Sequence, residues 1–365
     1  MAYARLVSLL LLLVLAVPAL ALAGADGRND RAVTVMTRNL YFGADLTPAI
    51  TARTVPELIG AVSHIFGVVQ ASNIPARAEA IAAEVAAVGP DLVGVQEVVL
   101  WRSQCPSDFA PVPNAVFVEF DYLQSLLDAL TARGAAYEVV AVHETNDLEA
   151  PGFTTRGFCD VRFTDREVIL ARVDRAHNDP LVLTNVQDGT FVAQVSFDLP
   201  TGATYTQRRG WLSVDVEARG AQFRFVTTHL EPESPVAEVN AVQEAQGAEV
   251  LAGPANTTLP VVYVCDCNSR ADGTGTATYA DALAAGFADA WLERERHDPG
   301  LTCCQAEDLR NPVSLFDQRI DLVLVRGRAH VRQIQTVGGA QEDRTPDGLW
   351  PSDHAGVVAT LQLQP

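Results

Sequence analysis

Polar residues stand at the ends of six apolar stretches, and their types are those that bind cations and transfer protons. Because strand ends gather at one rim of a sheet, where catalytic residues are commonly found, we expect these side chains to lie together. The sequence therefore predicts one site built from six separate segments. In chain order, these segments are Thr37-Arg-Asn39, Gln96-Glu97, Thr227-Thr-His229, Asp266-Cys-Asn268, Arg319-Ile-Asp321 and Ser352-Asp-His354.

Each segment also has a structural explanation when it is taken alone. Glu97 could be a solvated strand end, the 266–268 turn could be capped by its own side chains, and His229 could be an ordinary half-buried histidine. Asp321 is harder to explain in this way, because it lies one residue into an apolar run and a buried carboxylate requires a partner. Six such coincidences in one chain favour a functional site.

The residue types indicate the chemistry of this site. Carboxylates with asparagine form an oxygen-rich set that suits Mg²⁺, Mn²⁺ or Ca²⁺ better than a thiolate or imidazole site does. The two histidines supply proton transfer and hydrogen bonds to an anion. A hard cation with histidines and carboxylates is what hydrolysis of a phosphate ester requires.

The ordered set resembles the endonuclease/exonuclease/phosphatase superfamily, to which the DNase I-like nucleases belong. The match covers nearly the whole chain after its N-terminal segment, with every block in the family's order. The resemblance implies an α/β fold, a four-layer α/β sandwich in which two packed mixed β-sheets are flanked by helices. It also implies a phosphoesterase, acting on diesters, that uses Mg²⁺ (or Mn²⁺ or Ca²⁺), and the N-terminal segment described below adds the expectation that it is secreted.

The resemblance implies three metal-site residues. Glu97 would be the principal ligand, with Asn39 beside it and Asp353 at or near the metal.

The resemblance also implies roles for the catalytic residues. His354 would contact the scissile phosphate or act as acid and base, held by Asp321. His229 and Asn268 would bind phosphoryl oxygens, and Asp266 would orient or deprotonate the attacking water.

Three further features bear on this comparison. The nuclease branch supports its first histidine with a carboxylate, and Asp165 is the candidate here. Cys265 and Cys267 replace the glycine and the apolar residue that the family usually has around its Asp-x-Asn block. No counterpart is found of the tyrosine that some branches place near the phosphate.

The substrate stays open between a nucleic acid and a phospholipid headgroup. Four arginines are candidates for phosphate contacts near the site: Arg38, Arg156, Arg166 and Arg270. Three alternatives to the diesterase are a phosphomonoesterase of the same fold, a non-catalytic binding protein that keeps the motif, and a hydrolase with a cysteine nucleophile.

Composition excludes several other classes. The chain has 365 residues and a net charge of −19, which argues against a broadly basic nucleic-acid surface. It contains no lysine, so Schiff-base chemistry and a P-loop lysine are excluded.

The N-terminal residues 1–23 have the pattern of a secretory signal peptide. Arg5 precedes an apolar run from Leu6 to Leu22, and Ala21-Leu-Ala23 supplies a small-x-small cleavage site. A membrane anchor is the competing interpretation, which Pro18 disfavours. We expect a secreted or periplasmic monomer without a stable membrane anchor after cleavage.

An exported chain with six cysteines is expected to form disulfides. Cys105 and Cys159 are the first pair predicted. One of Cys265 and Cys267 could pair with Cys303 or Cys304, and a zinc site made from these four cysteines is the alternative.

The remainder, residues 32–365, is predicted to be a single domain because no linker or composition shift marks a boundary. The polar stretch Glu144–Thr164 is expected to be a loop. The helix Pro56–Gln70 is expected to pack on the core, with a lid or a lipid-contacting helix as alternatives. The predicted helices are Pro56–Gln70, Ala76–Val88, Tyr122–Arg133, Val236–Ala252 and Tyr279–Gly286. The predicted strands are Val33–Met36, Asp91–Glu97, Tyr137–Val142, Glu167–Val173, Phe191–Phe197, Gly210–Glu217, Phe223–Thr228, Leu259–Cys265, Ile320–Val325 and Val357–Leu363.

Overall fold

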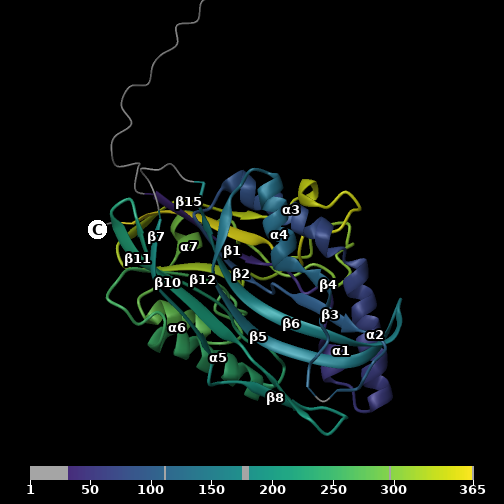
Figure 1. Cartoon of the computed structure of the whole chain (residues 1–365). Coiled ribbons are helices and arrows are strands. Elements are labelled where there is room, and N and C mark those ends of the chain that lie inside the picture. The colour runs from purple at the N-terminus through teal and green to yellow at the C-terminus, as the bar shows by residue number, and fades with distance from the viewer. Residues whose placement is uncertain (1–31, 111, 175–180, 296, 364–365) are drawn as a thin grey trace, which may run out of the picture. The chain divides into compact units, whose positions relative to one another are not determined.

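The computed structural model describes residues 32–110, 112–174, 181–295 and 297–363, which belong to one unit of the chain (Figure 1). The predicted signal peptide, residues 1–23, lies outside the described residues.

Two mixed β-sheets form the centre of this unit. The first has the strand order β15-β16-β1-β2-β6-β3-β4, with β5 paired to β6, and the second has the order β13-β14-β12-β11-β10-β7. The strands of the first sheet are β1 (Ala32–Asn39), β2 (Leu92–Gln96), β3 (Leu100–Gln104), β4 (Phe117–Asp121), β5 (Tyr137–Thr154), β6 (Gly157–Arg172), β15 (Ala329–Val337) and β16 (Gly356–Leu363). Those of the second are β7 (Val182–Thr190), β10 (Gly210–Ala218), β11 (Ala221–His229), β12 (Val261–Asp266), β13 (Ala288–Asp289) and β14 (Asp321–Arg326). A separate hairpin joins β8 (Val195–Asp198) to β9 (Thr204–Gln207).

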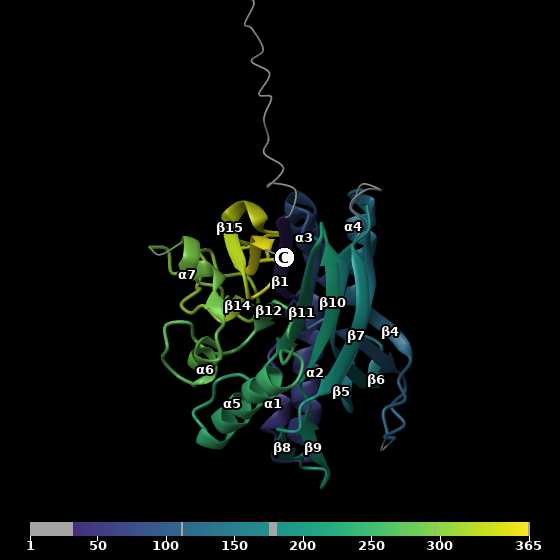
Figure 2. The same cartoon turned by 90° about the vertical axis from the view of Figure 1, so that its left-hand side faces the viewer.

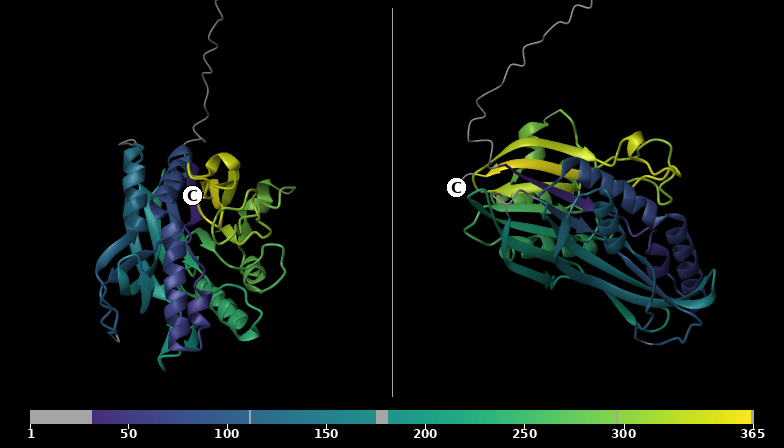
Figure 3. Two further views of the ribbon diagram at one scale, coloured as in Figure 1. Left: turned by 90° about the vertical axis from the view of Figure 1, so that its right-hand side faces the viewer. Right: turned by 45° about the horizontal axis from the view of Figure 1, so that its top comes forward.

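Helices cover both outer faces, which gives four layers (Figures 2 and 3). The first sheet is covered by α2 (Val55–Ala71), α3 (Ile74–Val88) and α4 (Tyr122–Ala132), preceded by the short α1 (Thr47–Ile50). The second is covered by α5 (Ala237–Ala252) and α6 (Thr278–Ala284), and the short α7 (Ala290–Arg294) packs on β14 and β15. The predicted four-layer α/β sandwich is confirmed.

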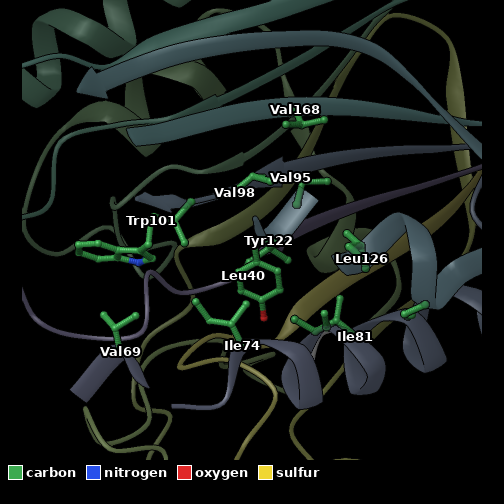
Figure 4. Packing of buried hydrophobic residues seen from close by; sticks show 14 of the residues in the cluster. Leu40, Val69, Ile74, Ile81, Val95, Val98, Trp101, Tyr122, Leu126 and Val168 are labelled. Carbon is green, nitrogen blue, oxygen red and sulfur yellow. The ribbon is translucent and has the colours of Figure 1, made fainter. Parts of the chain in front are cut away.

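Local sequence explains where the main helices begin and end. Thr54 caps α2 by accepting a hydrogen bond from the Glu57 amide, and Asn73 caps α3. Gly89 ends α3 in the left-handed region, at φ 62°, where a side chain would be disfavoured. Apolar faces of α2, α3 and α4 then pack on the first sheet around Leu40, Val95 and Trp101 (Figure 4).

The two sheets approach each other closely at Gly94, next to the point where the polar residues begin. A Cβ atom on Gly94 would lie 2.4 Å from Oγ1 of Thr227, so this contact requires glycine. Gln96 bridges the sheets by donating a hydrogen bond to Thr227 Oγ1 at 3.0 Å. The apolar core between the sheets therefore ends in a polar layer that leads into the site.

Two element predictions are wrong. The stretch Glu144–Thr164 is not a loop, because it forms most of the long β5–β6 hairpin. Its strand pattern is hidden by polar residues on its partly exposed faces. Phe191–Phe197 is not one strand, since β7 ends at Thr190 and β8 begins at Val195.

The six cysteines form three disulfides. Cys105–Cys159 is confirmed. The other two pairs are Cys265–Cys267 and Cys303–Cys304, so the predicted bond between these two regions is wrong. Because all four sulfur atoms are engaged within their own pairs, the four-cysteine zinc site is wrong as well. The bond between Cys265 and Cys267 brackets Asp266 at the end of β12.

Among the described residues, no single helix has the length and apolar composition needed to cross a membrane. Only α2 and α3 together pass this test, and they are bent by 50° at their junction.

Candidate active site

The strand directions bring the predicted site residues to one edge of the paired sheets. β1 runs parallel to β2, and β11 runs parallel to β12. The site residues of these strands therefore lie at the carboxyl ends: Asn39, His229 and Asp266 end β1, β11 and β12, and Glu97 follows β2. β14 and β16 run the opposite way, so their first residues arrive at the same edge. Asp321 lies directly opposite Asp266 in the β12–β14 pairing.

Asn39 joins the two sheets within the site. Its Nδ2 atom donates hydrogen bonds to Glu97 Oε1 and to Asp266 Oδ2, both at 3.0 Å. The Phe42 amide donates to Glu97 Oε2 at 2.8 Å. Glu97 has φ 56°, an unusual backbone conformation that turns the chain immediately after β2. Burial, followed by the charge of Asp353, raises the pKa of Glu97 to about 8.

His354 lies between two carboxylates. Its Nδ1 atom is 2.8 Å from Asp321 Oδ2, and its Nε2 atom is 3.8 Å from Asp266 Oδ2. Burial lowers the pKa of His354, but the charges of Asp321, Asp266 and Asp353 outweigh it and raise the pKa well above the usual value. The ring is therefore an imidazolium that donates to Asp321.

His229 is held in the opposite protonation state. Arg209, on the loop before β10, donates a hydrogen bond to His229 Nδ1 at 2.8 Å. Burial, followed by the charges of Arg209 and His354, lowers the pKa of His229 well below the usual value. A neutral ring that accepts at Nδ1 carries its proton on Nε2, which lies 3.3 Å from Asp266 Oδ2.

The predicted support of His229 by Asp165 is not found. Asp165 accepts a hydrogen bond from Thr145 Oγ1 at 2.8 Å, on the next strand. The carboxylate beside the histidine is that of Glu167, whose Oε1 atom lies 3.8 Å from His229 Nδ1. Strand alternation explains the difference of two residues, because positions 165 and 167 of β6 point to the same face.

Asn268 and Asp353 complete the set of predicted residues. Asn268 donates from Nδ2 to the Leu230 carbonyl at 2.9 Å, and its amide donates to Asp266 Oδ1. Asp353 lies between Ser352 and His354, and burial raises its pKa. Both residues line the cleft described below.

The donor set fits a divalent cation. Glu97, Glu167, Asp266 and Asp321 are all buried, and three of their oxygen atoms have no hydrogen-bond partner among the described residues: Glu167 Oε1, Glu167 Oε2 and Asp321 Oδ1. Ligand atoms of Asp266, Asp321 and His354 lie within 4.8 Å of one another, and of these three residues the two carboxylates are the ones that could contact a cation while His354 is protonated. Buried carboxylates this close together require compensating positive charge.

The floor of a cleft of about 1360 Å³ is formed by Glu97, His229, Asp266, Asn268, Asp353 and His354. Glu167 and Asp321 do not line the cleft and contact the floor through His229 and His354. The arginines predicted to reach the phosphate, Arg38, Arg156, Arg166 and Arg270, do not line it. Each forms an ion pair with a carboxylate, and these partners are Glu84, Glu119, Asp121 and Glu233, in that order. Arg38 also donates a hydrogen bond to the main-chain carbonyl of His354.

Two other arginines, Arg208 and Arg209, line the cleft in their place. Sequence reasoning missed them, although their position directly before a predicted strand was a usable signal. The acidic side chains that line the cleft are Asp45, Glu97, Asp147, Glu149, Asp160, Glu231, Glu233, Asp266, Glu307 and Asp353.

No model of a known protein family matches the sequence, and no curated protein matches it. Solved structures do. An endonuclease/exonuclease/phosphatase from Beutenbergia cavernae is 22% identical, with a TM-score of 0.54, over 91% of this chain and 72% of that one. The chain therefore has the endonuclease/exonuclease/phosphatase fold.

Two further structures with this fold differ from each other in what they act on. A mannosyl-6-phosphatase from Bacteroides thetaiotaomicron is 16% identical, with a TM-score of 0.52, over 90% of this chain and 99% of that one. TDP2 from D. rerio, solved with a single-strand DNA product, is 17% identical, with a TM-score of 0.51, over 91% and 99%. The shared fold therefore leaves the substrate of this chain open.

Proposed function

We propose that this chain is an exported, divalent-metal-dependent phosphodiesterase. The observation that carries the proposal is the cleft floor, where one protonated and one neutral histidine face Asp266 from two sides. A purely structural role does not explain this arrangement, because it concentrates unpaired carboxylates that destabilise a fold.

His354 is the proton donor and phosphate-binding group in this proposal. Its Nδ1–H is engaged by Asp321, which fixes the ring and leaves Nε2–H directed into the cleft. From there it donates a hydrogen bond to a phosphoryl oxygen or gives its proton to the leaving oxygen.

Asp266 and His229 act on the nucleophile and on the phosphoryl group. Asp266 has a pKa raised to about 6, with burial as the main cause, which suits a carboxylate that accepts a proton from water near neutral pH. His229 presents Nε2–H, and Asn268 stands beside it to contact phosphoryl oxygens.

A divalent cation such as Mg²⁺ or Mn²⁺ would be held by Glu97, with Asn39 and Asp353 near it. When bound, it would neutralise negative charge on the phosphoryl oxygens. The residues fit this group because the buried carboxylates of Glu97 and Asp353 lie close enough for the charge of Asp353 to raise the pKa of Glu97, and a cation there would offset both charges.

The proposed reaction is a hydrolysis that consumes one water molecule. The water oxygen forms a bond to phosphorus, one P–O ester bond breaks, one water proton passes to Asp266, and the leaving oxygen receives a proton from His354. The products are a phosphomonoester and an alcohol.

Hydrolysis of bis-p-nitrophenyl phosphate tests the proposal. Turnover should require Mg²⁺ or Mn²⁺, and Glu97→Ala and His354→Ala should each lower kcat by about 10³-fold, since they remove a cation ligand and a proton donor. Val192→Ser, which changes an exposed residue outside the cleft, is the matched control.

Two outcomes would contradict the proposal. Preference for p-nitrophenyl phosphate over the diester would indicate a phosphomonoesterase. Absence of turnover of either compound with any divalent cation, in a folded protein, would indicate a binding protein that keeps the motif.

Export is the second part of the proposal, and it rests on the signal-peptide pattern of residues 1–23. Expression of the full chain with its own N-terminus, followed by N-terminal sequencing of protein from the medium or periplasm, tests it. We expect Gly24 as the first residue, and retention of Met1 in the membrane fraction would indicate an anchor instead.

A further inference from the structure

The cleft extends beyond its charged floor along an apolar wall, which the proposed reaction does not use. We define the apolar wall as Ile50 of α1, Leu58 and Val62 of α2, Leu148 of β5, and Phe197 and Leu199 at the β8–β9 hairpin. These segments gather at one end of the paired sheets (Figures 1 and 2). A wall of this kind accommodates an apolar part of a substrate whose phosphate lies on the floor.

An exposed aromatic patch lies at the mouth of the same cleft. We define the rim patch as Phe109 and Phe153, which are 63% and 62% exposed. Phe109 lines the cleft itself, and Phe109 and Phe153 both pack on Phe158, with ring centroids 5.5 and 5.0 Å away.

The rim patch is attached to a rigid part of the fold. The disulfide Cys105–Cys159 ties the segment before Phe109 to the β5–β6 hairpin near its tip. The amide of Phe153 donates a hydrogen bond to Ser63 Oγ of α2 at 2.7 Å. Exposed aromatic side chains held in this way indicate an interaction surface, and aromatic rings are favoured at the interface of a bilayer.

The charge of the cleft decides which substrates fit. A nucleic-acid strand requires several cationic side chains along its backbone. Here ten acidic side chains line the cleft, and three of them, Asp147, Glu231 and Glu233, are paired with arginines. The other seven carboxylates leave the cleft acidic, and Arg209, one of its two lining arginines, is buried against His229. A substrate that carries a positive group close to its single phosphodiester is complementary to such a cleft.

We infer that the substrate is a zwitterionic phospholipid, taken from a bilayer surface on which the rim patch docks. This inference rests on the proposed function. An acyl chain lies along the apolar wall, the phosphodiester lies on the floor, and the ammonium group of the headgroup faces the acidic side chains. The net charge of −19 favours zwitterionic over anionic surfaces.

Binding to vesicles tests the docking surface without any turnover. The mature protein, which is expected to begin at Gly24, should sediment with phosphatidylcholine/sphingomyelin vesicles. It should bind them better than it binds vesicles that contain phosphatidylserine. The double variant Phe109→Ser/Phe153→Ser should bind at least about tenfold more weakly, because two exposed rings are lost from the interface. Val192→Ser is the matched control, since it removes an exposed apolar side chain outside the cleft.

Turnover tests the apolar wall. Leu199→Gln should lower kcat/KM for the vesicle lipid about tenfold and leave bis-p-nitrophenyl phosphate hydrolysis within about twofold, because the small soluble diester does not need the wall. The unchanged soluble activity also shows that the variant is folded.

Failure of the inference differs from failure of the proposed function. Turnover of bis-p-nitrophenyl phosphate without binding or hydrolysis of vesicles would overturn the inference alone. A higher kcat/KM for a single-stranded oligonucleotide than for the lipid would assign the cleft to nucleic acid. Vesicle binding without turnover of any diester would overturn the proposed function.

Discussion

The floor and the apolar wall of the cleft are neighbours that are stabilised in opposite ways. Glu97 on the floor, and Glu167 and Asp321 next to its two histidines, are buried carboxylates, and burial raises the pKa of Glu97 and Glu167. On the wall, Leu58 and Val62 lie in the main core cluster that packs α2 on the first sheet.

The two regions therefore make opposite contributions to the stability of the fold. Burial of apolar side chains contributes about 25 cal/mol per Å², so the wall stabilises the fold. Buried unpaired charge destabilises it, and the floor is tolerated because Arg209 and a bound cation would offset its carboxylates. The predictions below separate these two contributions.

The largest effect is expected for Arg209→Leu. Without this guanidinium, Glu231, Asp165 and Glu167 lose the positive charge that lies among them, and the free energy of unfolding should fall by about 3–5 kcal/mol. Turnover of the soluble diester should fall by about 10²-fold, since His229 loses the hydrogen bond that fixes its ring. Denaturant unfolding and kinetics measure both.

Arg224→Leu is the control, because Arg224 pairs with Asp215 on a partly exposed part of the second sheet. An equal loss of unfolding free energy in the two variants would show that Arg209 contributes no more to stability than the arginine of an ordinary ion pair does.

Truncation of the wall should separate stability from chemistry. Leu58→Ala removes a 5% exposed side chain from the core and should cost about 2–5 kcal/mol. The kcat for bis-p-nitrophenyl phosphate should stay within about twofold, because Leu58 belongs to the apolar core cluster and is not one of the residues that act on the phosphodiester. A loss of kcat comparable to that of Arg209→Leu would show that wall and floor are one cooperative unit.

Cation binding should stabilise the floor. At about 100 times its Kd, Mg²⁺ or Mn²⁺ is expected to add about 2.7 kcal/mol to the free energy of unfolding. Differential scanning calorimetry with EDTA and with the cation measures this as a rise in Tm. The rise should be smaller in Glu97→Gln and unchanged in Leu58→Ala. A cation effect of the same size in Glu97→Gln would place the ion elsewhere.

The smallest effect is expected at the Asp215–Arg224 pair. The hydrogen bond from Arg224 lowers the pKa of Asp215. A carboxylate with a lowered folded-state pKa stabilises the fold above its unfolded-state value of about 3.9, and that stabilisation disappears as pH falls through the folded-state pKa. Because the pair is partly exposed, Asp215→Asn should cost only about 0.2–1 kcal/mol at pH 7.

Urea unfolding at pH 7 and at pH 3 checks this prediction. The difference between the parent chain and Asp215→Asn should be smaller at pH 3, and a difference that is independent of pH would contradict it.

The sequence by itself determined the architecture and most of the floor. Apolar strands that end in Asn39, Glu97, His229 and Asp266 predicted a shared edge, because strand direction decides where an end lies. β14 and β16 run antiparallel to β12 and β1, so Asp321 and the segment before β16 lie at that same edge.

Only the tertiary structure decided which neighbours these residues have. Arg209 rather than Arg38 faces the floor, and Glu167 rather than Asp165 stands beside His229, because these contacts depend on strand register and on the loop before β10. The pairs Cys265–Cys267 and Cys303–Cys304 were also decided by the structure, whereas Cys105–Cys159 was predicted from the sequence.

The apolar wall could not be predicted either. It assembles from α1, α2, β5 and the β8–β9 hairpin, which are up to about 150 residues apart in the chain. Local composition records which residues are apolar, but long-range packing decides which of them share a surface.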